Sequence, residues 1–315
     1  MRKNYYNKGK HFISSVIITA FVLVVSIGIN TGEMLGLADW KDVFNRFGVS
    51  DISTSNCDDG ISVHVIDVGK ADSIYINCGE TNILIDAGDV DTNNTVVNYL
   101  KKAGVQKLDL VVVSHPHRDH IGQMKSVIKE FQIDKFMMAR LPNELTPTGK
   151  TYENMLLELR SKKMKITQPK AGEELKFGDL RLKVLSPSYK VASDNINEYS
   201  IVLQAIYGSR RFLFMGDAGK PVEQELLYEG YNLHSDMLKV GHHGSRSAST
   251  KEFLEAVSPK YAILSVGENK SNLPKEEVIK RLKAYCKSIL RTDDDGTVVI
   301  LSDGKRVWSK TEKGS

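Results

Sequence analysis

The sequence predicts an α/β fold of the αββα type, in which two β-sheets pack face to face and helices cover their outer sides. Two observations predict it. From Ile61 onward, short apolar runs typical of strands alternate with longer segments of helical pattern. The stretch from Ile61 to Ser315, about 255 residues, is long for one core but usual for two packed sheets with outer helices. We therefore expect one domain over residues 61–315.

Five segments have the residue pattern of helices between these strands. They are Val96–Ala103, Tyr152–Lys162, Pro221–Glu229, Lys251–Val257 and Glu276–Lys283. Gly104 and Gly230 stand where helices commonly end in a left-handed residue. Ser249 and Glu252 have the spacing of a capping box, which predicts the start of a helix at Ser249.

The N-terminal segment predicts targeting to a membrane. Four basic residues lie in the first ten positions, and Phe12–Ile29 follows with eighteen residues and no charge. This order is typical of a signal peptide or a signal anchor, and eighteen residues just suffice to cross a hydrocarbon core of about 30 Å. We expect residues 1–30 to be one of the two and residues 31–60 to be a spacer. The domain would lie outside the cytoplasm, either anchored at the outer face of the cell membrane or secreted.

The charge of the chain limits long-range attraction to nucleic acid. The sequence has 43 basic and 39 acidic residues, and removing the four basic residues of the first ten positions leaves equal numbers. A neutral domain gains no long-range steering toward polyanions. Contact with phosphate would therefore depend on local basic groups. Arg246 is a better candidate for such a contact than the basic cluster at residues 160–165.

Residues 115–120 read His-Pro-His-Arg-Asp-His and follow an apolar run that predicts a buried strand. The loop after a strand can direct alternate side chains toward one point. His115 and His117 would then face one metal ion, and Asp119 and His120 would face a neighbouring ion. Imidazole and carboxylate suit zinc or manganese and need no thiolate. A solvated polar loop is the alternative, but three His and one Asp seldom share six positions by chance.

Polar groups of the same kind end three further apolar runs. Asp86 follows one run, Asp217 ends the next, and His242 with His243 follows another. A lone Asp or a lone pair of His would be read as a turn or a surface feature. Because all four runs, including residues 108–113, end in such groups, we expect a common site at the carboxyl ends of the strands.

The order of these motifs resembles the metallo-β-lactamase fold, and their details resemble the hydrolase domain of the ComEC competence protein family. The matching segments are Asp67-Val68-Gly69 with Asp72, residues 114–122, Ser200–Leu203, Leu238–Ser245 and Arg291-Thr292-Asp293. The resemblance spans roughly Ile61 to Ile300 and includes none of the membrane helices of a full competence channel. It implies a metal-dependent hydrolase that holds two divalent ions, Zn²⁺ or Mn²⁺.

The chain departs from the pattern of these relatives at three places. Lys70 stands where related proteins usually carry Gln. The wider superfamily has a third His for the first metal, whereas Asn195 or Asn197 occupies the corresponding stretch here. Leu273 precedes Pro274 where the family commonly has His. The second departure would weaken one metal site, and the third affects a substrate contact.

The ligand chemistry and the resemblance together define the expected site. Asp217 would bridge the two ions, because a carboxylate has two oxygens that can each bind a metal. His243 is the expected ligand by resemblance, and His242 would contact the substrate or donate a proton, although the two could be exchanged. Asp86 would orient a ligand His rather than bind metal. The full expectation is metal ligands His115, His117, Asp119, His120, Asp217 and His243, catalytic residues Asp119 and His242, and substrate contacts Asn197, Ser245 and Arg246.

These residues predict a dinuclear hydrolase in which a metal-bound hydroxide attacks phosphorus or an acyl carbon. An open position at the first ion suits a phosphodiester more than a small lactam ring, so we expect a phosphodiesterase or nuclease, with DNA among the candidate substrates. Two alternatives remain open. One is another esterase on the same scaffold, such as a phosphorylcholine esterase, a lactonase or a β-lactamase. The other is a non-catalytic binding protein.

Overall fold

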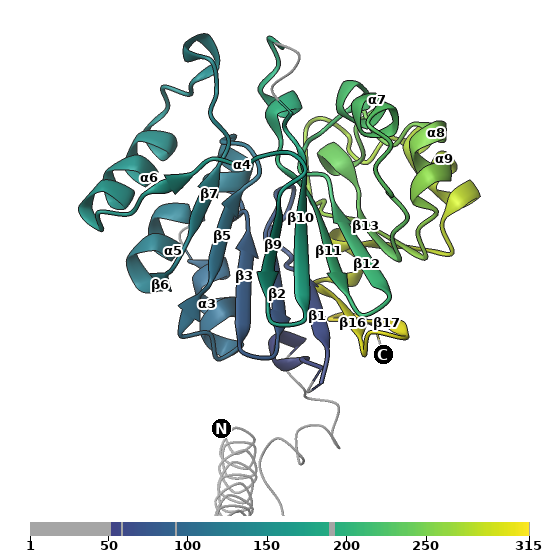
Figure 1. Ribbon diagram of the computed structural model, residues 1–315, viewed down its shortest axis with the longest axis horizontal. Coiled ribbons are helices and arrows are strands. Elements are labelled where there is room, and N and C mark those ends of the chain that lie inside the picture. The colour runs from purple at the N-terminus through teal and green to yellow at the C-terminus, as the bar shows by residue number, and fades with distance from the viewer. Residues whose placement is uncertain (1–51, 58, 92, 189–192, 315) are drawn as a thin grey trace, which may run out of the picture. The chain divides into compact units, whose positions relative to one another are not determined.

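Two β-sheets lie face to face, with helices on both outer sides, as the sequence predicts (Figure 1). The computed structural model describes residues 52–57, 59–91, 93–188 and 193–314. The expected membrane segment of residues 1–30 lies outside these ranges. Within them, no helix has both the length and the apolar character needed to cross a membrane.

The first sheet has eight strands and is parallel only along one side. Its outer strands β3, β5, β7 and β8 run parallel, and the other neighbours are antiparallel. In spatial order the strands are β17 (Val307–Thr311), β16 (Val298–Ser302), β1 (Ile61–Val65), β2 (Ile74–Cys78), β3 (Thr81–Ile85), β5 (Leu110–Val113), β7 (Phe136–Met138) and β8 (Ile166–Thr167). A small additional sheet pairs β4 (Lys107–Leu108) with β6 (Gln132–Ile133).

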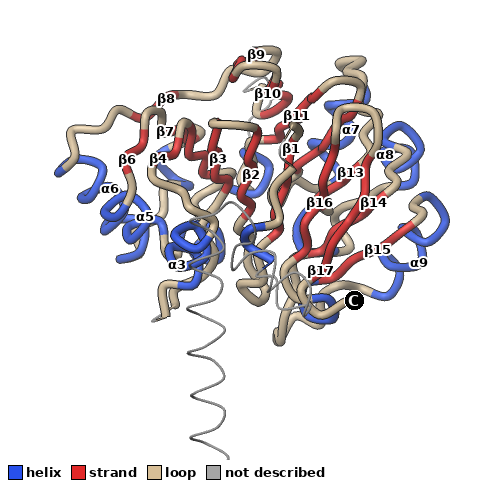
Figure 2. The backbone as a smooth tube through the Cα atoms, turned by 90° about the horizontal axis from the view of Figure 1, so that it is seen from below, coloured by secondary structure: helices blue, strands red, loops and turns tan. Residues whose placement is uncertain are grey.

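The second sheet has seven strands and repeats this arrangement. Strands β12 to β15 run parallel, and β9 to β12 are antiparallel. Their spatial order is β15 (Ser288–Arg291), β14 (Tyr261–Leu264), β13 (Met237–Lys239), β12 (Arg210–Phe214), β11 (Val202–Tyr207), β10 (Leu180–Ser186) and β9 (Glu174–Phe177). Figure 2 shows the two sheets from below, with the helices at the two outer sides.

The strands are apolar on both faces because both faces are covered. In β5, Leu110 and Val112 join the core between the sheets, whereas Val111 and Val113 face the helices of the first sheet. Successive strand residues point to opposite faces, so one short run supplies both cores. This double burial explains why the run reads as continuously hydrophobic rather than alternating.

Two groups of helices cover the outer faces of the sheets. The first sheet carries α3 (Thr95–Lys102), α4 (Arg118–Ile121), α5 (Met124–Glu130) and α6 (Lys150–Ser161). The second carries α7 (Lys220–Tyr228), α8 (Lys251–Val257) and α9 (Glu276–Tyr285), and α10 (Thr292–Asp295) follows β15. Single-turn 3₁₀ helices are η1 (Ile52–Thr54), η2 (Asn143–Leu145), η3 (Ile196–Tyr199) and η4 (Gly241–Gly244). All five predicted helices are present, with ends shifted by at most two residues.

The structure corrects two local predictions. The apolar run of residues 108–113 forms two strands rather than one, because Asp109 interrupts it and its carboxylate accepts a hydrogen bond from the Asn82 amide at 2.8 Å. The capping box of Ser249 and Glu252 does not form. Helix α8 is preceded by Thr250, and the carboxylate of Glu223 accepts hydrogen bonds from the backbone amides of Ser249 and Thr250. A side chain from α7 therefore replaces the local cap.

Candidate metal centre

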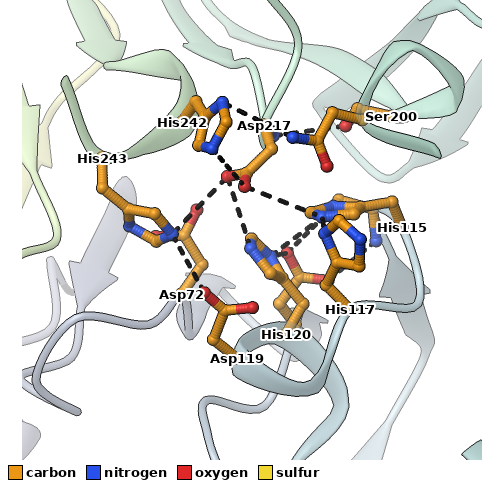
Figure 3. Close-up of polar contacts among 12 residues, drawn as sticks. Asp72, His115, His117, Asp119, His120, Ser200, Asp217, His242 and His243 are labelled. Carbon is orange, nitrogen blue, oxygen red and sulfur yellow. Dashed lines mark hydrogen bonds and ion pairs between the residues drawn. The ribbon is translucent and has the colours of Figure 1, made fainter. Parts of the chain in front are cut away.

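The loops at the carboxyl ends of β5, β12 and β13 bring six His and Asp side chains together near α4 (Figure 3). Parallel strands in each sheet end at the same edge, so loops far apart in sequence meet there. The expected ligands fall into two groups whose ligand atoms lie within 4.8 Å of one another: His115, His117 and Asp217 in the first, and Asp119, His120 and His243 in the second.

Asp217 lies between the two groups and offers one oxygen to each side. Its Oδ1 is 3.3 Å from His120 Nε2 and 3.5 Å from His243 Nε2. Its Oδ2 is 3.7 Å from His115 Nε2 and 3.6 Å from His242 Nε2. Asp217 therefore faces both groups of side chains, and its bridging of two ions stays a prediction.

Three buried polar atoms at the centre of this cluster have no hydrogen-bond partner: His120 Nε2, His243 Nε2 and Asp217 Oδ1. Buried polar groups are nearly always satisfied, and leaving one without a partner costs about 1–3 kcal/mol. Asp217 Oδ1 lies 3.3 Å from His120 Nε2 and 3.5 Å from His243 Nε2, and neither contact has the geometry of a hydrogen bond. A cation among them would satisfy all three, and nitrogen and carboxylate oxygen are suitable ligands for zinc or manganese.

The opposite nitrogen of each of these two His rings is held by the protein. His120 Nδ1 is 2.8 Å from Asp86 Oδ2, and His243 Nδ1 is 2.8 Å from the carbonyl oxygen of Ser265. Asp86 also accepts hydrogen bonds from the backbone amide and the hydroxyl of Ser114. These contacts fix the ring orientation, which is how proteins commonly support metal-ligating His. Asp86 thus contacts one His ring of the cluster from outside, and its role in supporting a metal ligand stays a prediction.

Electrostatics keep the carboxylates of the cluster charged. Burial alone would raise the pKa of Asp217, but attraction by His120, His243 and His115 holds that pKa well below its ordinary value. Asp119 is affected in the same direction: burial opposes ionisation, yet the nearby His243 and the charges of His120 and Lys70 lower its pKa. Burial lowers the pKa of His115, which favours the neutral ring that can bind a metal.

His242 lies at the more open side of the cluster, with 28 % of its side chain exposed. Both His242 and His243 adopt positive φ angles of 48° and 50°, a strained conformation for non-glycine residues. The tight η4 turn directs both rings toward Asp217. Asn197 lies beside His242, with its Nδ2 3.5 Å from His242 Nδ1, and its Oδ1 is buried without a partner. Asn197 therefore stands close to the cluster, as expected of a substrate contact.

The other two expected substrate contacts lie further from the cluster. Ser245 directly follows η4 and its hydroxyl accepts a hydrogen bond from Ser247. The guanidinium of Arg246 pairs with Glu277 of α9 at 3.0 Å, and 71 % of its side chain is exposed. Contact between Arg246 and a substrate would require this ion pair to open.

The structure adds residues to which the sequence assigned no role. Asp72 forms a further potential metal-binding group with His120 and Asp217, and its Oδ1 is 2.9 Å from the ammonium of buried Lys239. Lys70 pairs with Asp119 Oδ2 at 2.5 Å. Both Asp72 and Lys70 belong to the β1–β2 loop, whose motif carried the resemblance. In the sequence, this motif was the feature that could have indicated a role for Asp72 and Lys70 near the cluster.

A family model for the metallo-β-lactamase superfamily matches residues 66–268, which include every residue of the cluster. The chain belongs to this superfamily, whose members are mostly metal-dependent hydrolases. Figure 3 shows the cluster, with the His side chains arranged around Asp217.

The curated relatives belong to the ComEC family. The chain is 29 % identical to ComE operon protein 3 of Bacillus subtilis over 255 residues, which is 75 % of this chain and 32 % of that protein. It is 30 % identical to competence protein ComA of Neisseria gonorrhoeae over 269 residues, 84 % of this chain and 36 % of that protein. The chain thus spans about a third of the length of these relatives.

The fold is also similar to solved structures. One is CmlA, a diiron β-hydroxylase from Streptomyces venezuelae, with a TM-score of 0.53 and 12 % identity over 85 % of this chain and 59 % of CmlA. At this identity the similarity establishes the fold alone. The arrangement of two sheets and outer helices is therefore the common feature.

Proposed function

We propose that this protein is a dinuclear metal-dependent phosphodiesterase or nuclease. The observation that carries the proposal is the convergence of His120 Nε2, His243 Nε2 and Asp217 Oδ1, all buried and without partners. His115, His117 and Asp217 would hold one ion, and Asp119, His120, Asp217 and His243 would hold the other. When bound, a pair of divalent ions lowers the pKa of water toward neutrality and neutralises charge that develops on phosphorus.

The protein groups around the two ligand sets would position the substrate. His242 is partly exposed and its Nε2 faces Asp217 Oδ2, so it is placed to hold a proton near the leaving group. Burial lowers the pKa of His242, which keeps the ring neutral near pH 7 and able to accept a proton. Asn197 has a free buried oxygen beside His242 that could accept a hydrogen bond from a substrate hydroxyl or amine.

A phosphodiester is favoured over a lactam for two reasons. Asn195 or Asn197 lies in the stretch where the wider superfamily has a third His, and an amide in its place would leave one position of the first ion open to a substrate oxygen. One relative is a competence protein of Neisseria gonorrhoeae and another is recombination protein 2 of Haemophilus influenzae, which favours DNA as the polymer. The basic and apolar N-terminal segment supports a location at the outer face of the membrane, anchored or secreted, where DNA from outside the cell would be met.

The test is a comparison of substrates with the purified full-length chain in Mn²⁺ or Zn²⁺. The panel contains single- and double-stranded DNA, bis-p-nitrophenyl phosphate, a phosphorylcholine ester, a lactone and a β-lactam. We expect hydrolysis of the phosphodiesters, loss of that activity with EDTA, and its return with added metal. Turnover of the lactone or the β-lactam with no phosphodiester cleavage would contradict the proposal.

Location is tested separately by protease treatment of intact cells. We expect residues of the β-sandwich to be cleaved by added protease, because the domain lies outside the cytoplasm. Full protection in intact cells, with cleavage only after lysis, would contradict the outer location while leaving the catalytic proposal in place.

A further inference from the structure

Lys70 extends from the β1–β2 loop into the metal cluster and contacts a carboxylate that the proposed function assigns to metal. Its ammonium is 2.5 Å from Asp119 Oδ2, and the two side chains are 27 % and 19 % exposed. The same Asp119 oxygen is 3.7 Å from His243 Nε2. Asp119, His120 and His243 would surround the second ion. The ammonium of Lys70 therefore contacts one of these three residues, Asp119.

The backbone that carries Lys70 is held firmly against the cluster. The amide of Asp72 donates to the carbonyl oxygen of Asp119 at 3.1 Å, and the amide of Gly69 donates to Asp67 Oδ1 at 3.2 Å. Gly267 packs closely on the other side, since a Cβ there would lie 2.7 Å from Gly69 Cα. The base of the Lys70 side chain is thus fixed, whereas its long flexible stem can move the ammonium.

A divalent cation held by Asp119, His120 and His243 would share the Asp119 carboxylate with the ammonium of Lys70. Two like charges a few ångströms apart repel strongly in a partly buried site. Two other cations near the cluster are engaged elsewhere, Lys239 with Asp72 and Arg246 with Glu277. When the second ion binds, Lys70 must leave Asp119 and move toward the exposed side of the cluster.

We propose, building on the proposed function, that Lys70 is a movable cation with two positions: it neutralises Asp119 when the second ion is absent, and it contacts a non-bridging oxygen of an anionic substrate when that ion is bound. Lys70 is then a specificity-determining residue, because only a substrate with negative charge at that place benefits from the second position. It also makes the second ion bind more weakly than the cluster alone would allow.

The first experiment measures Mn²⁺ binding to the full-length chain by calorimetry, with no turnover involved. Lys70→Met removes the competing charge. The affinity of the more weakly bound ion should therefore be at least about tenfold higher than in the wild type. Lys70→Arg keeps the charge and should bind like the wild type. Lys107→Met is the matched control, because Lys107 pairs with Asp134 at 2.8 Å in β4, away from the cluster. Equal or weaker Mn²⁺ binding in Lys70→Met would overturn the proposal.

The second experiment measures the affinity of the Mn²⁺-loaded protein for inorganic phosphate. Lys70→Met should bind phosphate about tenfold more weakly, the opposite direction to its effect on metal, while Lys70→Arg and Lys107→Met stay near the wild type. Unchanged phosphate affinity in Lys70→Met would show that Lys70 does not reach the substrate and would overturn the second position. Failure of the proposed function has a different signature: the wild type would cleave no phosphodiester, whatever the two affinities are.

Discussion

At the scale of single residues, Asp217 holds the cluster together because each of its oxygens faces a different set of His rings. Oδ1 faces His120 and His243, and Oδ2 faces His115 and His242. Its pKa is held well below the ordinary value, so the carboxylate is anionic near pH 7. The carboxylate supplies negative charge to both proposed ions, so loss of that charge should affect both.

Replacing Asp217 or Asp119 by Asn should abolish phosphodiester hydrolysis and lower metal content, because each change removes an anionic ligand. Metal content measured by mass spectrometry and turnover of bis-p-nitrophenyl phosphate are the readouts, with circular dichroism to verify folding. Asp134→Asn serves as a control, since this exposed carboxylate pairs with Lys107. Normal turnover and metal content in Asp217→Asn would show that the bridging assignment is wrong.

Asp86→Asn should weaken the site without destroying it. Asp86 accepts from Ser114 and contacts His120 Nδ1, so it orients the ring and does not face the ions. Loss of such a supporting carboxylate typically costs about 10–100-fold in metal affinity or activity. Metal titration followed by kinetics would measure this loss. A defect as complete as that of Asp217→Asn would instead indicate that Asp86 binds metal directly.

At the scale of secondary-structure elements, the buried carboxylate of Glu223 on α7 caps the neighbouring helix α8. It accepts from the amides of Ser249 and Thr250 and from the hydroxyl of Thr250. The first amides of a helix lack partners within that helix. A side chain of α7 thereby binds the first amides of α8 and links the two helices. The turn η4, which carries His242 and His243, lies a few residues before the start of α8.

Glu223→Ala should destabilise the protein more than a surface change would. Removing a helix cap costs about 0.5–2 kcal/mol, and leaving buried amides without partners adds to that cost. Urea unfolding of the metal-free protein gives the free energy of unfolding. Gln224→Ala on the same helix is the matched control, since this side chain is exposed. Equal stabilities of the two variants would contradict the capping role.

Strand β1 contains a buried histidine that should make stability depend on pH. Burial lowers the pKa of His64 from 6.5 to about 3, so the ring stays neutral in the fold while the unfolded chain takes up a proton below pH 6.5. The contribution of His64 to the free energy of unfolding is therefore fully present above pH 6.5. It is lost progressively as the pH falls from 6.5 toward 3.

Between pH 7 and pH 5 this histidine alone should remove about 2 kcal/mol from the free energy of unfolding. His64→Phe keeps an aromatic ring but cannot be protonated, so its stability should fall less over the same range. Urea unfolding at the two pH values, with EDTA present, measures both slopes. Parallel slopes for His64→Phe and the wild type would refute this source of pH dependence.

The elements were predictable to different degrees for physical reasons. The helices α3, α6, α7, α8 and α9 have local signals in their own residues, such as Gly104 (φ 80°) and Gly230 (φ 70°) just past the ends of α3 and α7. The cap of α8 could not be predicted, because it comes from Glu223, which is near α8 only in three dimensions. Similarly, the break at Asp109 depends on the neighbouring Asn82 amide.

At the scale of the whole molecule, the buried pair of Lys239 and Asp72 joins the two sheets beneath the metal cluster. Lys239 ends β13 of the second sheet, Asp72 lies in the β1–β2 loop of the first, and both side chains are almost fully buried. Taking two charges out of water is costly unless they remain paired. The pair therefore favours one alignment of the sheets over others.

Breaking this pair from one side should destabilise the protein by about 3–5 kcal/mol, because the remaining charge is buried without compensation. We expect this of Lys239→Met and of Asp72→Asn, each measured by urea unfolding in EDTA. The double variant should lose clearly less than the sum of the two single losses. Additive losses would mean that the two side chains act independently.

The candidate site was predictable where ligands are close in sequence and less so where they meet only in the fold. The spacing of His115, His117, Asp119 and His120 is a local signal, and Asp217 and His243 follow apolar runs. The roles of Asp72 and Lys70 depend on contacts with Lys239 and Asp119 across the sandwich. No spacing rule in a single sequence contains such contacts.

The ligands of the proposed centre are divided between the two halves of the chain: four lie between residues 115 and 120, and Asp217 and His243 lie beyond residue 200. Each of the potential metal-binding groups in the described residues draws side chains from both halves. Metal uptake must then follow the docking of the two sheets during maturation, because the binding site does not exist before that step. A bound ion would act as a cross-link over more than a hundred residues of chain, and metal content would report whether a given molecule has completed its assembly.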